Sequence, residues 1–501
     1  MKKKYIDIPL FTTLDEIVNK NYTLSATQYK SFNISNKNIK PLSDFLDREL
    51  AREDLGYEVG SECYVENSSY VFIKTKALQQ EFYLLDENKE SIQCITPHNY
   101  VEMGLKQGDL LISKDSNVGE IVILDKDYPN AMLCGGIYRL PITNNKYYLL
   151  AFIKSNVFRQ QIDFLVPRGS TIRHGKTKFL DCLIPLPNKN SEDTIKYVEL
   201  LMQAIINKEI EIRKKHNLIL GEIQKELELN QSGQKFKYNL PSISEIMNLD
   251  RMDSSLYSED FRRKEFLITN YKYGYQTLTD KGYRGVRGTS LENNFIKNRI
   301  DSDVFVEGFY KLIIPTNITK YGTVAKITYI GTSTQLKTIK QGDIIFGGEG
   351  YGKGKSFVVI ENEDNIATNY HGIRIVCDKE ASINSKIFVK CILTYLRENG
   401  LIDCYGVGGN GGHFAPAYFY LAKIPNFPIE KENQIVKLYH NSNSNYETSN
   451  LKLDNFLDYD NKFNQEAGIY ELDKSMLAPG GISHSGPGEN RQFWPAENSQ
   501  S

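Results

Sequence analysis

The longest run of regularly spaced hydrophobic positions lies in the middle of the chain, at residues 191–230. Ser191 can cap a helix, and the two acids that follow it suit a first helical turn. Apolar residues then recur at three- and four-residue spacing, and Glu209 and His216 fall in the same stripe. This pattern predicts one helix of about 36 residues, about 54 Å long, with a narrow apolar face like a coiled-coil seam.

Short apolar runs alternate with turns on both sides of this helix, as expected for strands. Examples are residues 70–73, 119–124 and 326–330. Each flank also has a helical pattern late in its span, near 147–159 and near 385–398. The pattern therefore predicts an α+β domain on each side of the long helix.

The two flanks also repeat one another. Residues 105–112, LKQGDLLI, recur as residues 339–346, IKQGDIIF, and the glycines give an offset of 342 − 108 = 234. Three weaker matches keep the same order, with offsets of 228, 236 and 240: they are 24–29 with 252–257, 136–140 with 372–376, and 184–185 with 424–425. Short loop insertions account for the drift, so we predict a tandem duplication of one domain.

The repeat sets the predicted domain boundaries. We expect a first domain at 1–190, a spacer helix at 191–235 and a second domain at 236–428. A second spacer helix is expected at 429–460, although the stretch NSNSN at 441–445 interrupts it. The remaining residues, 461–501, form a Gly- and Pro-containing tail that we expect to be disordered.

One stretch, FGGEGYGKGKSF at 346–357, approaches the phosphate-binding P-loop pattern in two frames but completes neither. A P-loop opens a helix, whereas FVVI at 357–360 predicts a strand. The matching stretch of the first half, ISKDSNVGEIVIL at 112–124, keeps Gly119 but loses the lysine-rich loop. We therefore expect a hairpin whose tip differs between the repeats.

Composition narrows the class of protein. With 61 Lys+Arg against 62 Asp+Glu, the formal charge is −1, which argues against a uniformly basic nucleic-acid coat but allows local basic patches. The seven cysteines show no C-x-x-C spacing and are expected to be reduced, mostly core thiols of a cytoplasmic protein. No signal peptide or membrane span is expected.

Catalytic patterns are weak. The sequence has no H-E-x-x-H, no G-x-S-x-G and no Asn-Pro-Pro-aromatic motif. Asp343 and Glu349 lie near two lysines, as in a metal-dependent nuclease, but their counterparts Asp109 and Glu120 have a different spacing. We therefore predict no catalytic residue, no metal site and no cofactor bound by this chain.

Several loops gather cations without acids, at 166–178, 281–288 and 311–340, and a glycine-rich loop at 408–414 aligns with the first of them. Such clusters are where a polyanion would bind, because Lys and Arg hold phosphates while Arg and Asn can read base edges. The predicted DNA-binding residues are Arg168, Arg173, His174, Lys176, Lys178, Lys281, Arg284, Arg287, Lys353, Lys355, Asn410 and His413.

Taken in order, these motifs resemble the specificity subunits of type I restriction-modification systems. The resemblance is carried by the repeated KQGD segments, the openings NYTLSATQYKSF and LDRMDSSLYSEDF, and the loops GSTIRHGKTKFLDCLIPLP and GGNGGHFAPAYF, each followed by an Ile-Pro segment and a helix. It covers roughly residues 1–445. One departure is the interrupted second helix.

This resemblance implies two target-recognition domains, each reading one half of a split DNA site, joined by two antiparallel spacer helices. It also implies two methyltransferase subunits as partners, which use S-adenosylmethionine to methylate adenine, and motor-nuclease subunits that can join for ATP-dependent restriction. The subunit itself would be non-catalytic. Two alternatives stay open: a nucleotide- or metal-dependent nuclease that uses the 346–357 loop, and a repeat scaffold that binds other proteins.

Overall fold

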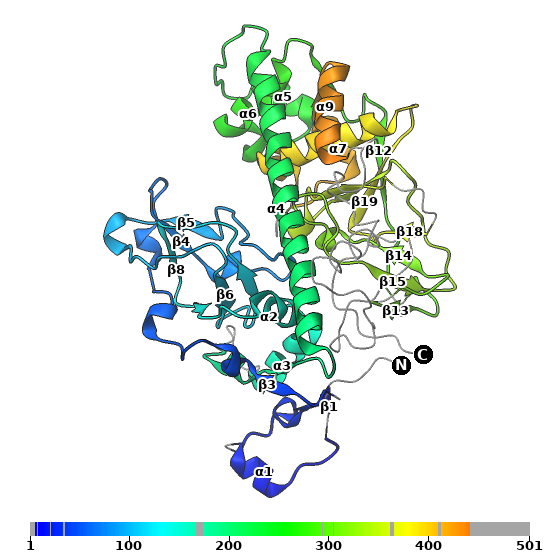
Figure 1. Ribbon diagram of the computed structural model, residues 1–501. Coiled ribbons are helices and arrows are strands. Elements are labelled where there is room, and N and C mark those ends of the chain that lie inside the picture. Colours follow the sequence, from blue (N-terminus) through cyan, green and yellow to red (C-terminus); the bar gives the residue numbers. More distant parts are fainter. Residues whose placement is uncertain are drawn as a thin grey trace. The chain divides into compact units, whose positions relative to one another are not determined.

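The chain divides into two compact units, and the boundary between them, at Ile210 and Glu211, falls inside one long helix. The structure is a computed structural model that describes residues 6–7, 9–20, 22–33, 36–166, 174–292, 294–303, 305–360, 365–408 and 412–440. Within these residues both units mix helices and strands, as the hydrophobic pattern predicts (Figure 1).

The first unit begins with a short strand and a short helix, and then alternates strands with loops before two further helices. Its elements are β1 (Ile6–Asp7), α1 (Leu14–Asn19), β2 (Ser31–Phe32), β3 (Ile39–Pro41), β4 (Val71–Ile73), β5 (Ile92–Cys94), β6 (Leu110–Ser113), β7 (Ile121–Ile123), β8 (Ala131–Leu133), β9 (Ile137–Leu140), α2 (Lys146–Ile153), α3 (Asn156–Leu165) and β10 (Leu183–Pro185). The helices α2 and α3 pack against the sheet of β6, β7 and β9.

The second unit repeats the order of the strands from β3 to β10. Its elements are α5 (Ile243–Leu249), α6 (Glu259–Thr269), β11 (Tyr275–Thr277), β12 (Tyr283–Arg287), β13 (Ile300–Ser302), β14 (Tyr310–Leu312), β15 (Thr328–Gly331), β16 (Ile344–Gly347), β17 (Ser356–Val358), β18 (Ile366–Ala367), β19 (Gly372–Cys377), α7 (Ile383–Glu398), α8 (Leu401–Tyr405), β20 (Lys423–Pro425) and α9 (Ile429–Tyr439). In the part of the chain that the structure describes, the first unit lacks β12 and β13, and the second unit has no counterpart of β1 and β2.

Eight described strands of each unit pair in the same way, and β13 is an additional edge strand beside β15 in the second unit. The order β7-β6-β9 in the first corresponds to β17-β16-β19 in the second, where β12 adds a fourth strand. The order β5-β4-β8, with a parallel β4–β8 pair, corresponds to β15-β14-β18, with a parallel β14–β18 pair. The pairs β3–β10 and β11–β20 also match. The structure thus confirms that the two halves share one topology.

The register corrects one predicted match by a single residue. In the first unit Leu111 pairs with Arg139, and in the second Ile345 pairs with Arg374. Arg139 therefore corresponds to Arg374, an offset of 374 − 139 = 235, whereas the sequence pattern suggests 236. The sequence alignment places glycine on glycine, but the strand pairing places arginine on arginine.

Helix α4 (Ser191–Leu229) is one continuous helix of 39 residues, so the predicted long helix is confirmed (Figure 1). Its apolar stripe packs into the first core through Ile195, Met202 and Ile206. Later in the helix, Ile219 and Ile223 pack into the second core. The periodicity persists because both ends of the helix are covered, each by a different unit.

Both polar residues of this stripe make contacts within their own unit. Oε2 of Glu209 accepts a hydrogen bond of 2.9 Å from the backbone N–H of Tyr83. His216 is 7% exposed and packs edge-on against the ring of Tyr321, with 5.1 Å between ring centroids. Burial lowers the pKa of His216 to about 3, helped by the positive charges of Lys390, Lys320 and Arg397. The imidazole is therefore neutral at pH 7.

The other predicted elements are largely confirmed. The strand predictions at 70–73, 119–124 and 326–330 match β4, β7 and β15, and the helix at 385–398 matches α7. The helix expected at 147–159 is instead two helices, α2 and α3, because the Ser155 side chain caps a new helix by accepting from the N–H of Phe158. The interrupted part of the second spacer helix and the tail at 461–501 lie outside the described residues.

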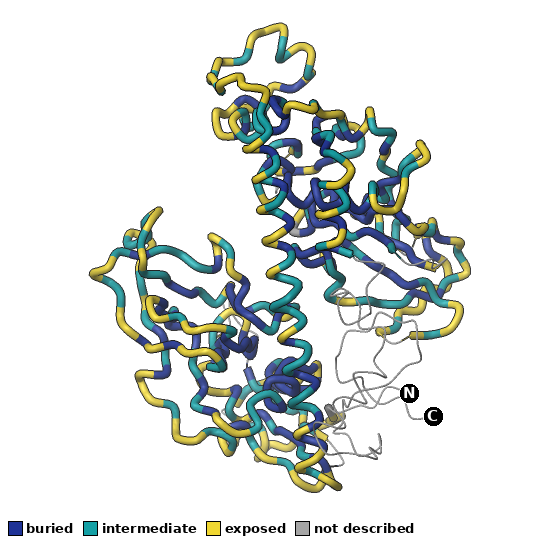
Figure 2. Tube along the Cα trace, turned by 45° about the horizontal axis from the view of Figure 1, so that its top comes forward, coloured by how far each residue is buried: buried dark blue, intermediate teal, exposed yellow. Residues whose placement is uncertain are grey.

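Each unit has a core between strands and helices, and strands and loops form further cores. Buried residues, dark blue in Figure 2, follow the strands and the covering helices in each unit. All seven cysteines are free thiols. Cys182 and Cys391 are buried core residues, and Cys134, Cys377 and Cys404 are half-buried and pack against the cores. The other two are half-buried.

Candidate nucleic-acid interface

The repeated Lys-Gln-Gly-Asp segment builds the same turn in both units. The backbone N–H groups of Lys106 and Lys340 donate to Asp109 and Asp343, at 2.9 and 3.0 Å. The glycine before each aspartate has a positive φ, 86° and 83°, a backbone conformation that glycine adopts at little cost. The aspartates are thus turn-capping residues that lead into β6 and β16.

Each of these aspartates also pairs with the corresponding arginine on the neighbouring strand. Arg139 Nη1 lies 3.8 Å from Asp109, and Arg374 Nε lies 2.9 Å from Asp343. The same two arginines donate to backbone carbonyls, of Met103 at 2.9 Å and Thr338 at 2.6 Å. Asp343 therefore has a structural role, which argues against its use as a nuclease carboxylate.

The glycine- and lysine-rich stretch at 346–357 is a hairpin tip, as predicted. It joins antiparallel β16 and β17 through a short 3-10 turn at Gly350–Gly352, and no helix follows it. Lys353 Nζ lies 2.8 Å from Asp403, and Lys355 is 5% exposed. Neither lysine is placed like the phosphate-binding lysine of a P-loop.

The end of each hairpin strand carries a carboxylate that binds a histidine from a distant loop. In the first unit, Nδ1 of His174 lies 2.8 Å from Oδ1 of Asp115. In the second, Nδ1 of His413 binds Glu349, at the corresponding place along β16. The backbone of each carboxylate residue also bridges to that of its histidine. We call these two contacts the carboxylate–histidine pairs.

The two carboxylate–histidine pairs expose the same group. The carboxylate side chains of Asp115 and Glu349 are each 16% exposed, whereas the imidazoles of His174 and His413 are 64% and 52% exposed. Each imidazole uses Nδ1 toward the carboxylate, which leaves Nε2 as the ring atom available to a ligand. These are fixed, outward-facing polar groups, the kind that hydrogen-bonds a ligand.

Glu349 has further partners in the second unit. Nδ1 of His371, which precedes β19, binds its Oε1, and Nη1 of Arg287, at the end of β12, lies 4.0 Å from the same oxygen. Burial alone would raise the pKa of Glu349, but the hydrogen bond with His371 and the nearby His413 and Arg287 outweigh it and lower the pKa. The carboxylate stays ionised at neutral pH.

Other predicted cations lie on the same sheet. The guanidinium of Arg287 stacks 4.8 Å from the ring centre of Tyr370, whose side chain is half exposed. Arg284, also on β12, is exposed and pairs with Asp378 at 2.7 Å. Burial lowers the pKa of Lys281, opposed by the charge of Glu432. The structure thus brings Arg287 and His413 together at Glu349 but leaves Arg284 and Lys281 outside that cluster.

The remaining predicted residues divide into described and undescribed positions. Lys176 lies in the turn after His174, with φ of 45°, and Lys178 pairs with Asp181 at 3.2 Å. Arg168, Arg173 and Asn410 lie outside the described residues. The DNA-contacting role of all these residues stays a prediction.

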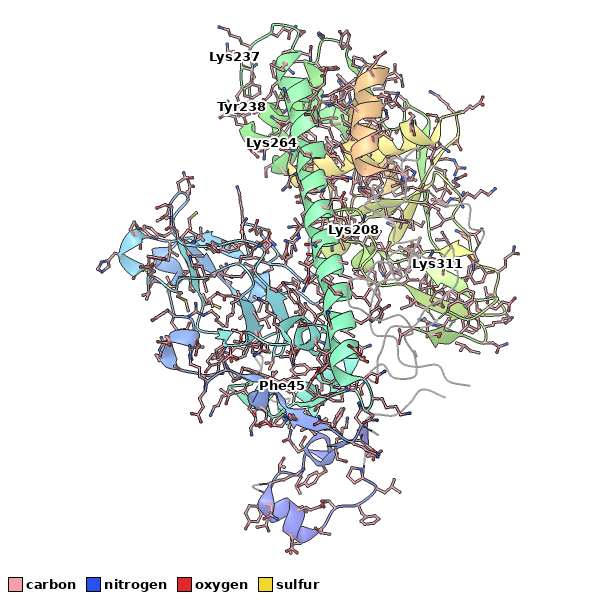
Figure 3. The ribbon with its side chains drawn as sticks, in the orientation of Figure 1. Phe45, Lys208, Lys237, Tyr238, Lys264 and Lys311 are labelled. Carbon is pink, nitrogen blue, oxygen red and sulfur yellow. The ribbon has the colours of Figure 1, made fainter. Side chains whose placement is uncertain are left out.

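The acid-free span 311–340 does not form one cationic surface. Lys311, labelled in Figure 3, belongs to β14 and is 7% exposed. Lys326 pairs with Asp303, 3.5 Å away on a neighbouring loop. A run without acids in sequence therefore gains acidic neighbours, or becomes buried, once the strands pair.

Sequence reasoning missed Asp115 and His371, and it considered Glu349 only as a nuclease carboxylate. Asp115 and His174 are 59 residues apart, while Glu349 and His413 are 413 − 349 = 64 apart. A signal was present, because each carboxylate follows its KQGD segment at the same distance, 115 − 109 = 349 − 343 = 6. The change from Asp to Glu conceals the match.

Among the described residues, no group of three or more His, Cys, Asp and Glu side chains could hold a metal ion. Likewise, no described helix combines the length and apolarity needed to cross a membrane. These findings add no further candidate site.

No protein-family model and no curated protein matches this sequence. Among solved structures, the chain is similar to the S subunit of a type I restriction-modification system from M. genitalium, with 12% identity, coverage of 87% of this chain and 94% of that one, and a TM-score of 0.36. It is also similar to the HsdS subunit from Thermoanaerobacter tengcongensis, with 12% identity, coverage of 86% and 90%, and a TM-score of 0.24.

Proposed function

We propose that this chain is a DNA-sequence-specificity subunit of a type I restriction-modification complex, and that each unit reads one half of a bipartite site. The supporting observation is that one framework occurs twice with different side chains at the same hairpin tip. The two units share strand pairing, the capped Asp turn and the carboxylate–histidine pair. Duplicated scaffolds with different exposed loops suit the recognition of two different sequences.

Recognition of DNA requires groups for phosphates and for base edges. In this proposal, two histidines and one arginine beside the hairpin tips face the duplex: His174 in the first unit and His413 with Arg287 in the second. Arg and His donate to the acceptors of a purine edge or a phosphate. The near-zero net charge fits a protein that attracts DNA through local patches.

The long helix has a part in this proposal. A straight helix of 39 residues is about 58 Å long, against about 34 Å for one turn of DNA. We propose that α4, with α9 beside its second half through the Lys431–Glu222 ion pair, sets the gap between the half-sites.

The chemistry belongs to partners in this proposal. The chain is non-catalytic, acts in the cytoplasm, and directs two methyltransferase subunits to adenines in the site. Motor-nuclease subunits can join the complex for restriction. The seven free thiols fit a reducing compartment.

The experiment compares the adenine methylomes of one host with and without this chain, with the methyltransferase subunits present in both. A bipartite methylated motif should appear only with the chain. Binding of the assembled complex to that site should weaken steeply with salt, because phosphate contacts release counterions. Identical methylomes, together with no sequence preference in binding, would contradict the proposal.

A further inference from the structure

The two carboxylate–histidine pairs share their geometry but differ in what surrounds them. Tyr138 and Ile373 occupy corresponding positions, because they pair with Ile112 and Phe346. The backbone of Leu55 bridges to Tyr138, and Arg287 pairs with Ile373. Leu55 therefore stands where the second unit has Arg287.

The same register identifies the counterpart of His371. Ile137 corresponds to Gly372, since they pair with Ser113 and Gly347. The residues just before them are Gly136 and His371. The first unit thus has glycine and leucine where the second has histidine and arginine, and its Asp115 pairs instead with the adjacent Lys114.

The three groups around Glu349 are held in fixed orientations. The carboxylate is 16% exposed, whereas His371 and His413 are 63% and 52% exposed. Glu349 binds both imidazoles at Nδ1, so both Nε2 atoms are available to a ligand, and Tyr370 stacks on the guanidinium of Arg287. A polar group held by a second interaction loses less freedom when it binds, which favours selective contacts.

We propose that His371 and Arg287 determine the base preference of the second unit, and that Glu349 is their positioning residue; this rests on the proposed function. The ligand is a hydrogen-bond acceptor of duplex DNA. Purine edges present N7 and, in guanine, O6, and phosphates present oxygens. We favour the base edge because the shared histidine, His413 or His174, supplies the contact common to both units, while the differing pair provides a contact that only one unit makes.

The test converts the second unit's pair into the residues of the first. The double variant Arg287→Leu with His371→Gly is compared with the wild-type complex by selection from a duplex library randomised across both half-sites. We expect the preferred bases of one half-site to change, with discrimination at those positions falling about tenfold or more. The other half-site should be read as before.

Glu349→Gln gives a second measurement. It keeps the size of the side chain but removes the charge that holds the imidazoles, so preference at the same positions should broaden without moving to new ones. Arg263→Ala is the matched control, because Arg263 is an exposed arginine of the same unit that pairs with Glu259 on α6, outside the cluster and outside the predicted DNA-binding residues. It should leave base preference unchanged.

Two results would overturn the inference while the proposed function stands. One is a wild-type complex with clear base preference that the folded double variant keeps at both half-sites. The other is uniformly weaker binding with a smaller salt dependence and unchanged preference, which identifies phosphate contacts. A wild-type complex without any base preference would instead remove the proposed function itself. Circular dichroism spectra that match the wild type establish folding of each variant.

Discussion

The first and second units of this chain share several interior contacts but differ in the side chains around the carboxylate of one hairpin. Inside, both have an arginine–aspartate pair across the central strands and a buried lysine on the helical layer, Lys154 directly after α2 and Lys390 within α7. At the edge, one hairpin tip has a single histidine on its carboxylate and the other has two histidines and an arginine. The comparison teaches that the fold constrains the turn and the strand pairing, while the tip is free to carry different side chains.

The same comparison shows where the interior has changed. Lys154 donates to the carbonyl of Gln79 at 2.6 Å and lies 3.8 Å from Glu120. Lys390 lies instead 4.1 Å from the ring centre of Tyr439, and Lys355 occupies the place of Glu120. Burial lowers the pKa of each lysine, Lys154 and Lys390, to about 8. The same buried charge is thus stabilised by a carboxylate in one unit and by an aromatic ring in the other.

The largest expected effect comes from the glycine that each unit uses for close backbone approach. A Cβ at Gly56 would lie 2.1 Å from the carbonyl oxygen of Cys134, and one at Gly288 would lie 2.2 Å from that of Asn369. Replacing either glycine by alanine forces the backbone to shift. We expect the free energy of unfolding of the affected unit to fall by about 2–4 kcal/mol. Hydrogen exchange of the neighbouring strands measures the loss unit by unit.

Gly221→Ala is the control for these two variants. Nothing lies within 4 Å of a Cβ at that position of α4, so the change should stabilise the helix by about 1 kcal/mol. Unequal losses at Gly56 and Gly288, with one near zero, would show that the two frameworks are not equivalent.

A second prediction concerns the polar residue of the α4 stripe in the second unit. The pKa of His216 is lowered to about 3, below an unfolded value of about 6.5. The unfolded chain therefore takes up a proton first as pH falls, and stability decreases from about pH 6.5 downward. At pH 5 this contribution amounts to about 2 kcal/mol.

His216→Phe removes the titrating group, so the wild type should lose about 2 kcal/mol more stability than the variant between pH 7.5 and pH 5. Hydrogen exchange of α7 at the two pH values measures the difference. Equal pH dependence in both proteins would contradict the buried, neutral state of His216. The hydrogen exchange of helix α2 in the first unit should change with pH by the same amount in the wild type and the variant.

A smaller difference is expected between the two capping aspartates. Asp343 is 10% exposed with its arginine at 2.9 Å, whereas Asp109 is 26% exposed with its arginine at 3.8 Å. Asp343→Asn should therefore lower the free energy of unfolding by about 2 kcal/mol and Asp109→Asn by about 1 kcal/mol. The interaction lost is stronger in the closer and less solvated pair. Local exchange of the two hairpins tests this order, and the reverse order would refute it.

The smallest effect is expected on DNA binding, when Lys353 and Lys355 are replaced. Asp403 binds the first, and the second is buried. We expect the double alanine variant to keep the salt dependence of DNA binding, once its folding is confirmed. If the slope of the logarithm of the binding constant against the logarithm of the salt concentration fell by about one or two, these lysines would be shown to contact phosphates.

Much of the framework could be predicted from the sequence because it depends on local patterns. The KQGD segments specify a turn, and the three- and four-residue spacing of 191–230 specifies α4. The break between α2 and α3 could not be seen in the apolar pattern, since it depends on Ser155 competing as a cap.

The candidate site was less predictable because its contacts join distant segments. Arg287 and His413 could be selected as a cation and a histidine on loops, but their shared partner Glu349 lies 62 and 64 residues away. Lys355 looks like an exposed loop residue in sequence and becomes buried only when β17 pairs with β16. Charge clusters in sequence locate loops, but strand pairing decides which charges face outward.

The central claim is that each unit recognises its own half of the DNA site. The most direct test is to make the two units identical. A chain in which the second domain, residues 236–428, is replaced by a copy of the first is expressed with its methyltransferase partners, and the methylome is sequenced. We predict a motif in which the first unit's half-site occurs twice. A folded chimera that assembles and still methylates the original two different half-sites would contradict the claim that each unit reads its own half.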